Sequence, residues 1–262
     1  MTTSSSLTGK FSGCLLCSDF DGTITTDGKS FTPENLDAVR YFTSEGGRFT
    51  MATGRFPDHF IPMEDFAINA PVIALGGSVI ADISDGVKIL SERVIAPEII
   101  RKLVSTFELI PGVKRLIVHS SSDSVTFTPG DRDVGEKLAT ALSRPVCKFI
   151  VMEEPRIEPP LRGYMEQNFP ELNFEMSWCA GLEGFSKGVC KGSAVKLLRE
   201  MLGGIHTVIC VGDYENDISM IKYADIGCAV ANASDEVKAA ADRITVSNRE
   251  NAIAAIVSEL AD

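Results

Sequence analysis

The stretch that decides the fold is CLLCS at residues 14–18, followed directly by DFDGT at residues 19–23. The apolar run predicts a buried strand, and in an extended strand Asp19 and Asp21 point the same way while Phe20 points into the packing. Two neighbouring carboxylates repel, and each raises the pKa of the other unless a cation or a shared proton relieves them. A hard cation such as Mg²⁺ fits such a pair, because it takes one or two carboxylates together with substrate phosphate oxygens. A surface turn is the alternative, since Asp-Gly is a common turn signal.

The composition limits which partners the protein can have. The chain has 262 residues and a formal net charge of -11, with a pI near 4.8. This charge argues against nucleic acid and against an anionic membrane, because both would be repelled at long range. An anionic substrate therefore needs local positive charge or a metal ion at its site. His59, His119 and His206 stand apart from one another and from any cysteine pair, so a zinc site has no support in the sequence.

The N-terminus and the cysteines indicate the compartment. Residues 1–10, MTTSSSLTGK, lack the apolar region of a signal peptide, and no stretch approaches the roughly 20 apolar residues of a membrane span. We therefore expect a cytoplasmic protein whose residues 1–10 form a flexible tail. The cysteines mostly lie in apolar runs, which predicts buried, reduced thiols. Cys14 and Cys17 form a CxxC pair, but positions i and i+3 of a strand face opposite sides, so we expect them to pack rather than react.

Strands alternate with helices at both ends of the chain. Thr32-Pro33 opens the first helix, with the hydroxyl as its cap and proline at its first position. Such alternation builds parallel sheets covered on both faces, so we predict an α/β fold with a doubly wound, Rossmann-like parallel-sheet core. The expected strands are 49–52, 72–75, 207–211, 226–230 and 243–246, and the later helices are expected at about 57–66, 192–202, 216–222, 234–241 and 249–260.

The middle of the chain, residues 82–187, has a different pattern. Strand candidates at 113–119 and 124–128 follow one another with turn residues between them rather than a helix. This pattern predicts an inserted α+β domain with its own antiparallel sheet. The length of the chain accommodates such an insertion. We therefore expect a core made of residues 11–81 and 188–262, with residues 82–187 inserted between its two parts.

Three further segments stand where a core strand ends or a helix begins. Thr53-Gly54 offers a hydroxyl and backbone N–H groups that can hold phosphate oxygens, with a helix N-cap as the alternative. Lys191-Gly192 begins a helix, where a positive charge is unfavourable unless an anion is bound; a solvated surface lysine is the alternative. GDYEND at residues 212–217 directly follows a buried strand. Its three carboxylates and amide would be poor core material, which favours a site.

Together, DFDGT at 19–23, TGR at 53–55, KG at 191–192 and GDYEND at 212–217 resemble the haloacid dehalogenase superfamily of phosphohydrolases. The long insertion, with Lys-Gly directly behind it, is similar to the Cof-type subfamily with a large α/β cap of the C2 type. The resemblance covers nearly the whole chain beyond the N-terminal tail. It implies the same core and cap arrangement that the alternation of elements predicts.

The resemblance also implies roles for four aspartates. Asp19 would attack the substrate phosphorus and become an aspartyl phosphate, while Asp21 would protonate the leaving oxygen and then deprotonate the hydrolytic water. One carboxylate must stay ionised near Mg²⁺ while its neighbour carries a proton, which makes this division physically sensible. Asp213 would complete the Mg²⁺ site with Asp19 and the backbone carbonyl of Asp21, and Asp217 would bind the metal directly or through water.

The phosphate-binding group implied by the resemblance contains Thr53, Gly54, Lys191 and Asn216. The first three would hold phosphate oxygens, and Asn216 would orient the site from beside the metal. Arg55 would reach either the phosphate or the cap.

Two positions depart from the subfamily pattern. Gly76-Gly77 stands where Asn-Gly is common, so one polar contact near the phosphate is either missing or supplied from elsewhere. Glu250-Asn251-Ala252 stands where Asp-Gly is usual, which affects that turn but not the chemistry.

We therefore predict a Mg²⁺-dependent phosphatase for small phosphorylated metabolites, with sugar phosphates as the first expectation and nucleotides and phosphorylated cofactors as alternatives. A phosphomutase, which returns the phosphoryl group to the substrate, is the alternative within catalysis. A non-catalytic sensor of phosphorylated metabolites is the alternative from another class. The cap should set the substrate, and Trp178, Cys179 and Glu183 are expected contributors near its returning joint.

Overall fold

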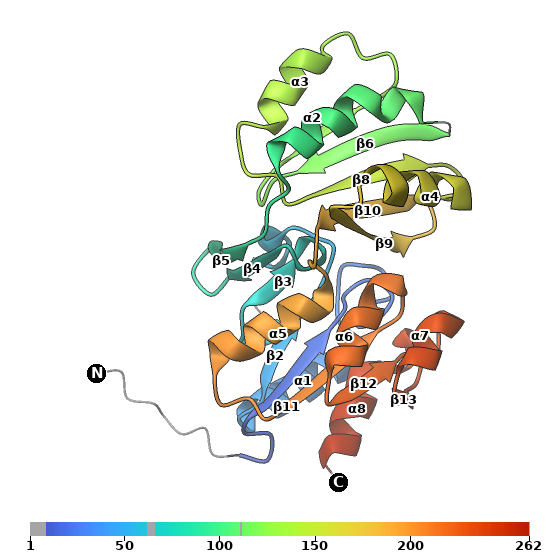
Figure 1. Ribbon diagram of the computed structural model, residues 1–262. Helices are drawn as coiled ribbons and strands as arrows, with labels where there is room; N and C mark the ends of the chain where they lie inside the picture. The colour runs from blue at the N-terminus through green and yellow to red at the C-terminus, as the bar shows by residue number, and fades with distance from the viewer. Residues whose placement is uncertain (1–8, 62–65, 111, 262) are drawn as a thin grey trace.

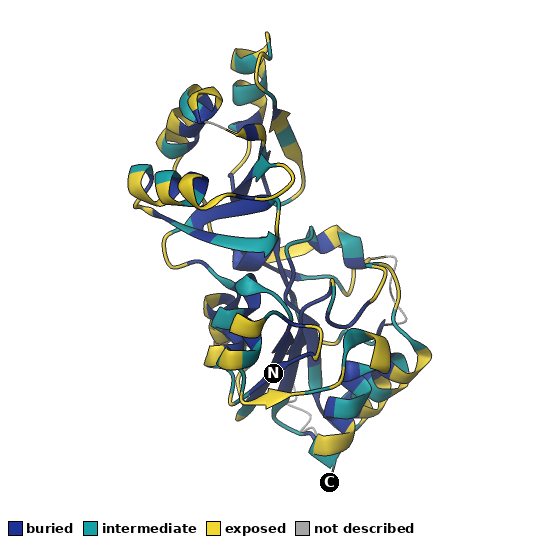
Figure 2. Cartoon of the chain, turned by 90° about the vertical axis from the view of Figure 1, so that its right-hand side faces the viewer, coloured by how far each residue is buried: buried dark blue, intermediate teal, exposed yellow. Residues whose placement is uncertain are grey.

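The computed structural model describes residues 9–61, 66–110 and 112–261, and it places one sheet-containing body above another (Figure 1). We name the lower body the core and the upper body the cap, and we propose residues 11–81 with 188–262 for the core and 82–187 for the cap. Of the predicted tail, residues 1–8 lie outside the described residues. Buried residues concentrate in the strands of both bodies, and exposed residues cover the outer surfaces of the helices (Figure 2).

A parallel sheet forms the centre of the core. Its strands lie in the order β13-β12-β11-β1-β2, and every neighbouring pair is parallel. A single parallel bridge from Ala52 to Ile73 continues the sheet to β3. The predicted doubly wound parallel sheet is therefore confirmed. The strands are β1 (Cys14–Ser18), β2 (Arg48–Met51), β3 (Val72–Ala74), β11 (Thr207–Gly212), β12 (Ile226–Ala229) and β13 (Arg243–Ile244).

Helices cover both faces of the core sheet because its strands bury apolar side chains on both sides. Leu16 of β1 packs with Val39 of α1 and Ile253 of α8 on one face. Leu15 packs with Val195 of α5 on the other face. The core helices are α1 (Pro33–Ser44), α5 (Lys191–Leu202), α6 (Ile218–Tyr223), α7 (Asp235–Ala240) and α8 (Ala252–Ala261).

The order of the core strands decides where a ligand can bind. From β1 the chain moves through β2 to β3 in one direction, and it returns at β11 and continues through β12 to β13 in the other. β1 and β11 are therefore neighbours on either side of a topological switch point, the usual place for ligands in open α/β sheets. Asp19 follows β1 and Asp213 follows β11, so both lie at this point.

Local differences from the predicted elements have physical causes. The predicted helix at 57–66 is only a 3-10 helix, η1 (Pro57–Phe60), where the structure describes it, and positions 62–65 lie outside the described residues. Two further 3-10 helices precede core helices, η5 (Glu215–Asp217) before α6 and η6 (Asn248–Glu250) before α8. Asn251 keeps the turn before α8, since it adopts a φ of 64°, a left-handed conformation that asparagine tolerates well.

A small antiparallel sheet lies where the chain leaves the core. β4 (Val79–Asp82) pairs with β3 on one side and with β5 (Lys88–Glu92) on the other, and η3 (Leu75–Gly77) joins β3 to β4. Beyond β5 the chain enters the first cap helix (Figure 1).

The cap contains a five-stranded antiparallel sheet in the order β7-β6-β8-β10-β9, as the predicted α+β insertion requires. Its strands are β6 (Val113–His119), β7 (Ser124–Phe127), β8 (Lys148–Glu153), β9 (Leu172–Trp178) and β10 (Gly181–Ser186). Its helices are α2 (Pro97–Thr106), which η4 (Phe107–Leu109) extends, α3 (Val134–Ala141) and α4 (Pro159–Asn168).

The two faces of the cap sheet differ in chemistry. Alternate residues such as Val118, Phe149 and Leu182 pack against α2, α3 and α4 in one apolar cluster. The intervening residues face the core, and Lys148 of β8 donates to the carbonyl of Gly54 at 3.0 Å. The open face of the cap sheet therefore forms the roof over the switch point of the core.

The predicted packing of Cys14 and Cys17 agrees with the fold. All seven cysteines are free, and Cys14 and Cys17 pack into clusters on opposite faces of the core sheet. Among the described helices, none combines the length and the apolar character that crossing a membrane requires.

Candidate active site

A cavity of about 380 Å³ lies between the carboxyl ends of the core strands and the open face of the cap sheet. Asp19 and Asp213 reach it from the ends of β1 and β11, and Thr53 reaches it from the segment after β2. Its core lining is Asp19, Asp21, Thr53, Gly54, Arg55, Asp213, Tyr214 and Asn216. Its cap lining is His119, Lys148, Ile150, Ser177, Trp178 and Glu183.

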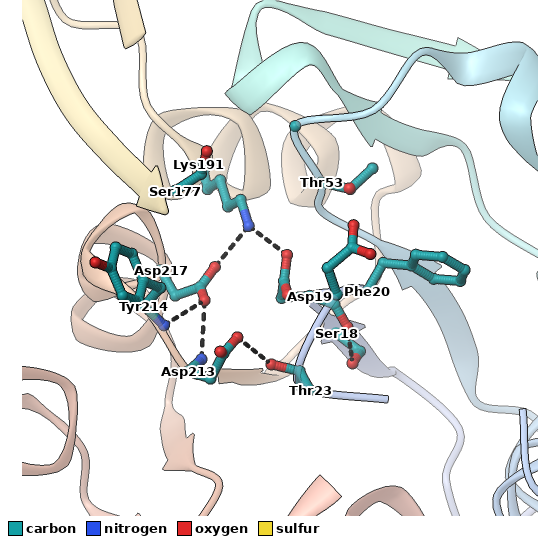
Figure 3. A network of polar contacts seen from close by, with 12 residues as sticks. Ser18, Asp19, Phe20, Thr23, Thr53, Ser177, Lys191, Asp213, Tyr214 and Asp217 are labelled. Carbon is teal, nitrogen blue, oxygen red and sulfur yellow. Dashed lines mark hydrogen bonds and ion pairs between the residues drawn. The ribbon is translucent and has the colours of Figure 1, made fainter. Parts of the chain in front are cut away.

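Lys191, at the N-terminus of α5, bridges two aspartates beside this cavity (Figure 3). Its Nζ lies 2.6 Å from Oδ1 of Asp19 and 2.6 Å from Oδ1 of Asp217, and the side chain is fully buried. Burial opposes its charge, but the two carboxylates prevail and hold the pKa of Lys191 above its usual range. The solvated surface lysine, left open by the sequence, is therefore wrong.

The surroundings of Asp19 and Asp213 disfavour the charged forms of their carboxyl groups. Burial raises the pKa of Asp19 well above its usual value, although Lys191 partly offsets this. Burial, and then the charge of Asp217, raises the pKa of Asp213 to about 6, while the Thr23 hydroxyl donates to Asp213 at 2.9 Å and acts in the opposite direction. Asp19, Asp213 and Asp217 each offer an oxygen within 4.8 Å of the others. This donor set suits a hard divalent cation, which would relieve the repulsion between the carboxylates.

Both carboxylate oxygens of Asp217 accept hydrogen bonds from the protein. Its Oδ2 accepts the backbone N–H groups of Asp213 at 2.9 Å and Tyr214 at 3.1 Å, and its Oδ1 accepts from Lys191 (Figure 3). Gly212 permits this close approach, because a Cβ there would lie 2.4 Å from the Cβ of Asp217. Asp217 therefore ties the loop after β11 to the lysine that holds Asp19.

Asp21 is held by Arg55, whose partner the sequence left open. Nη2 lies 2.6 Å from Oδ1 of Asp21 and Nε lies 2.7 Å from Oδ2, and the guanidinium carbon lies 5.1 Å from the centre of the Phe20 ring. The Asp21 side chain is 51% exposed and lines the cavity. This bidentate pair fixes the carboxylate of Asp21, which is more exposed than the carboxylates of Asp19 and Asp217.

The remaining predicted phosphate ligands also meet here. Thr53 and Asn216 are buried and line the cavity, and the Thr53 hydroxyl accepts the backbone N–H of Arg55 at 3.2 Å. Gly54 lies beside them, with its carbonyl bonded to Lys148 of the cap. The structure thus brings all the predicted site residues together, with Lys191 and Asp217 just behind the cavity lining, where Lys191 contacts Asp19 and Asp217 accepts the backbone N–H of Asp213.

Comparison with known proteins identifies the family. Residues 16–257 match the haloacid dehalogenase-like hydrolases. The chain belongs to this family. A putative phosphatase of Haemophilus influenzae is 26% identical, with 92% of this chain and 96% of that protein covered. The pyridoxal phosphate phosphatase YbhA of Escherichia coli is 24% identical, with 93% and 97% covered.

Solved structures agree on the fold. The structure of the sugar phosphatase BT4131, of subclass IIB of the superfamily, superposes with a TM-score of 0.80 at 19% identity, covering 94% of this chain and 98% of that one. With the family match and the phosphatase relatives, the chain is a Cof-type phosphohydrolase, an enzyme that hydrolyses phosphoric monoesters.

Side chains of the cap occupy the space beside Gly76, the position where the subfamily commonly has asparagine. A Cβ at Gly76, whose φ is 68°, would lie 2.5 Å from the Phe185 ring and 3.5 Å from Oε2 of Glu183. A side chain such as asparagine therefore does not fit at this position. Polar groups of the cap stand close to the place where that side chain would be.

The cap lining was the part of the hydrolase that the sequence described least. Trp178 and Glu183 line the cavity as expected, whereas Cys179 is exposed and lies outside the lining. His119 and Lys148 were not expected there. Lys148 had a usable signal, because it stands in the otherwise apolar run CKFIV at residues 147–151, where a charge needs a reason. His119 had none.

Proposed function

We propose that the hydrolase is a Mg²⁺-dependent phosphatase that acts on small phosphorylated metabolites, with sugar phosphates as substrates, through an aspartyl-phosphate intermediate. The observation that carries this proposal is the position of Asp19, at the cavity, 2.6 Å from the buried Lys191 and beside Asp213. The ammonium group of Lys191 orients this carboxylate, and a further positive charge, such as a metal ion, would let it approach an anionic phosphate.

In the first step Asp19 attacks the substrate phosphorus as the bond to the leaving oxygen breaks, and Asp21 gives a proton to that oxygen. In the second step Asp21 takes a proton from water, which attacks the phosphorus of the aspartyl phosphate, releases inorganic phosphate and restores Asp19. Both residues line the cavity where these steps would take place, with Asp19 2.6 Å from Lys191 and Asp21 half exposed, and the division of roles between them is part of the proposal.

The Mg²⁺ ion would be held by Asp19, Asp213 and Asp217 with the backbone carbonyl of Asp21. The residues fit a hard cation, because three buried or half-buried carboxylates converge on one another and burial raises the pKa of Asp19 and Asp213. When bound, the ion supplies positive charge that offsets the repulsion between these carboxylates and the substrate phosphate.

The phosphate oxygens would be held by the Thr53 hydroxyl, the backbone of Gly54, Lys191 and Asn216. Thr53, Gly54 and Asn216 line the cavity from the core, Lys191 lies behind this lining against Asp19, and the cap side chains complete the lining. The names of the relatives, a sugar phosphatase and a pyridoxal phosphate phosphatase, support small phosphorylated metabolites as the substrate class. The first is a likeness of fold, so sugar phosphates stay a proposal.

The test is Asp19→Asn, which removes the nucleophile and keeps the side-chain shape. With Mg²⁺ and p-nitrophenyl phosphate or sugar phosphates, we expect phosphate release to fall more than ~10³-fold while the melting temperature stays near that of the wild type. Asp37→Asn, at a site whose side chain is 78% exposed on α1, is the matched control and should keep wild-type rates. Wild-type turnover by Asp19→Asn would refute the nucleophile assignment.

The same assays separate the alternatives. Isomerised sugar without release of inorganic phosphate would indicate a phosphomutase. Tight metabolite binding without turnover on any phosphate ester would indicate a sensor.

A further inference from the structure

Three polar side chains stand on the open face of the cap sheet, in positions that an ordinary sheet would fill with apolar residues. His119, Lys148 and Glu183 are only 8%, 2% and 1% exposed, and they come from the adjacent strands β6, β8 and β10. His119 lies opposite Lys148 in the register of β6 and β8. All three line the cavity that also contains Asp19.

Lys148 and Glu183 form a buried ion pair that leaves hydrogen-bonding capacity unused. Nζ of Lys148 lies 2.9 Å from Oε1 of Glu183 and 3.0 Å from the carbonyl of Gly54, which uses two of its three donors. Oε1 of Glu183 also accepts from the Ser177 hydroxyl at 3.0 Å. Oε2 of Glu183 is buried and has no partner within the described part of the chain. One donor and one acceptor therefore remain.

His119 adds a second donor and a second acceptor. Neither ring nitrogen has a partner among residues 9–61, 66–110 and 112–261, although both are buried. Burial, and then the charge of Lys148, lowers the pKa of His119 to about 3, so the ring is neutral and carries one N–H and one bare nitrogen. Buried polar atoms without partners are rare and destabilising in folded proteins. His119 and Glu183 both line the cavity, so a molecule bound there can supply the partners.

We infer that His119, Lys148 and Glu183 form a subsite for the hydroxyl groups of a neutral, polyhydroxylated leaving group, an inference that rests on the proposed phosphatase function. A hydroxyl both donates and accepts, so it matches a wall that presents both kinds of group. A carboxylate or a second phosphate only accepts, and it would meet the unpaired oxygen of Glu183. The ion pair of Lys148 and Glu183 also cancels the net charge that a second anion would need.

The rest of the cavity agrees with a small, neutral group. Ile150 and Trp178 supply apolar surface for a carbon skeleton between the polar groups. The volume of about 380 Å³ lies near the lower end of the roughly 300–1,000 Å³ typical of small-molecule sites, which suits a monosaccharide or a polyol phosphate rather than a nucleotide.

The test compares substrates that differ only in hydroxyl groups or in charge. Steady-state phosphate release is measured for glucose 6-phosphate, ribose 5-phosphate and glycerol 3-phosphate, for hexyl phosphate without hydroxyls, and for 6-phosphogluconate with an added carboxylate. We expect the best hydroxylated substrate to exceed hexyl phosphate and 6-phosphogluconate in kcat/KM by at least about tenfold, because a site built to bind hydroxyls rejects analogues that leave its polar groups unpaired.

The variant His119→Phe keeps the ring and its contact with Phe56, whose centre lies 5.4 Å away, but removes both nitrogens. We expect kcat/KM for the best hydroxylated substrate to fall at least about tenfold, mainly through KM, and to fall several-fold more than for p-nitrophenyl phosphate, which has no hydroxyl for the subsite. His119→Asn, which retains a donor and an acceptor, should restore part of the loss. His206→Phe, at an exposed histidine before β11, is the matched control and should change neither substrate.

Two results would overturn the inference alone: equal turnover of hexyl phosphate and the sugar phosphates, or equal losses on both substrates in His119→Phe. Preference for 6-phosphogluconate would overturn it as well, because a carboxylate would then be the recognised group. If the wild type released phosphate from neither p-nitrophenyl phosphate nor any sugar phosphate, the proposed function would fail together with the inference.

Discussion

Lys191 is the residue whose removal should affect this protein most. Its ammonium group is the partner of two buried carboxylates, with Nζ at 2.6 Å from Asp19 and 2.6 Å from Asp217. Lys191→Met keeps most of the side-chain volume and removes the charge, so it leaves both carboxylates buried without their cation. The variant therefore isolates the electrostatic contribution of the lysine from its packing.

The size of the effect follows from this geometry. Breaking a buried ion pair by removing one partner destabilises a protein by ~3–5 kcal/mol, because the remaining charge stays desolvated. For a chain of this size each kcal/mol lowers the melting temperature by about 2–4 °C, so we expect a decrease of about 6–20 °C. Phosphate release should also fall at least ~10²-fold, since Lys191 orients the proposed nucleophile Asp19.

Thermal unfolding followed by circular dichroism, with EDTA present to remove divalent cations, measures the decrease in melting temperature. Lys196→Met is the matched control, because Lys196 is an exposed lysine of the same helix, α5, and its loss should change the free energy of unfolding by less than ~0.5 kcal/mol. A decrease of less than about 2 °C for Lys191→Met would refute the reasoning, since the two carboxylates would then not depend on its charge.

Two further predictions concern the cap. Arg162→Met removes an ion pair between α4 of the cap and η5 of the core, in which Nη1 of Arg162 lies 2.7 and 2.9 Å from the two carboxylate oxygens of Glu215. We expect KM to rise several-fold, because a partly exposed ion pair contributes about 1 kcal/mol. Arg156→Met is the control and should leave KM unchanged. Equal KM values for the two variants would contradict this. The second prediction concerns Glu175, because burial raises its pKa from the ordinary 4.5 to about 8. Between these two pH values the folded state keeps a proton that the unfolded state has lost. The free energy of unfolding should therefore fall by a few kcal/mol as pH rises from about 4.5 to 8. In urea unfolding at pH 5, 6.5 and 8, the slope should be shallower for Glu175→Gln than for the wild type, with the remainder due to Asp19 and Asp213, and an unchanged slope would contradict the assignment.

The sequence alone predicted much of the core. The apolar run before Asp19 and the one before Asp213 each indicate a buried strand, and the alternation with helices makes the strands parallel. Carboxyl ends of parallel strands meet at one edge, so both aspartates had to lie at that edge. Where the structure describes the helix predicted at 57–66, it shows the 3-10 helix Pro57–Phe60 instead of an α-helix, because apolar spacing does not decide between the two.

The burial of Lys191 could not be predicted from the sequence, because lysine is exposed in most proteins. Its position in the chain, 172 residues from Asp19, does not show that the two residues are in contact. Only the packing of α5 against the core sheet puts its ammonium group between two carboxylates. The sequence shows that the motifs of Asp19 and Asp217 carry negative charge, whereas only the tertiary structure shows that Lys191 is their partner.

The sequence by itself determined the fold class, the family and the edge of the sheet where the carboxylates gather, because strand periodicity and contiguous motifs are local properties of the chain. Tertiary structure alone decided the roof of the cavity. His119, Lys148 and Glu183 lie far apart in sequence, and only the antiparallel register of β6, β8 and β10 sets them on one face above Asp19. The physical reason is that a pairing register is set by non-local packing, and a shift of one residue in any of these strands would turn its polar side chain to the opposite face.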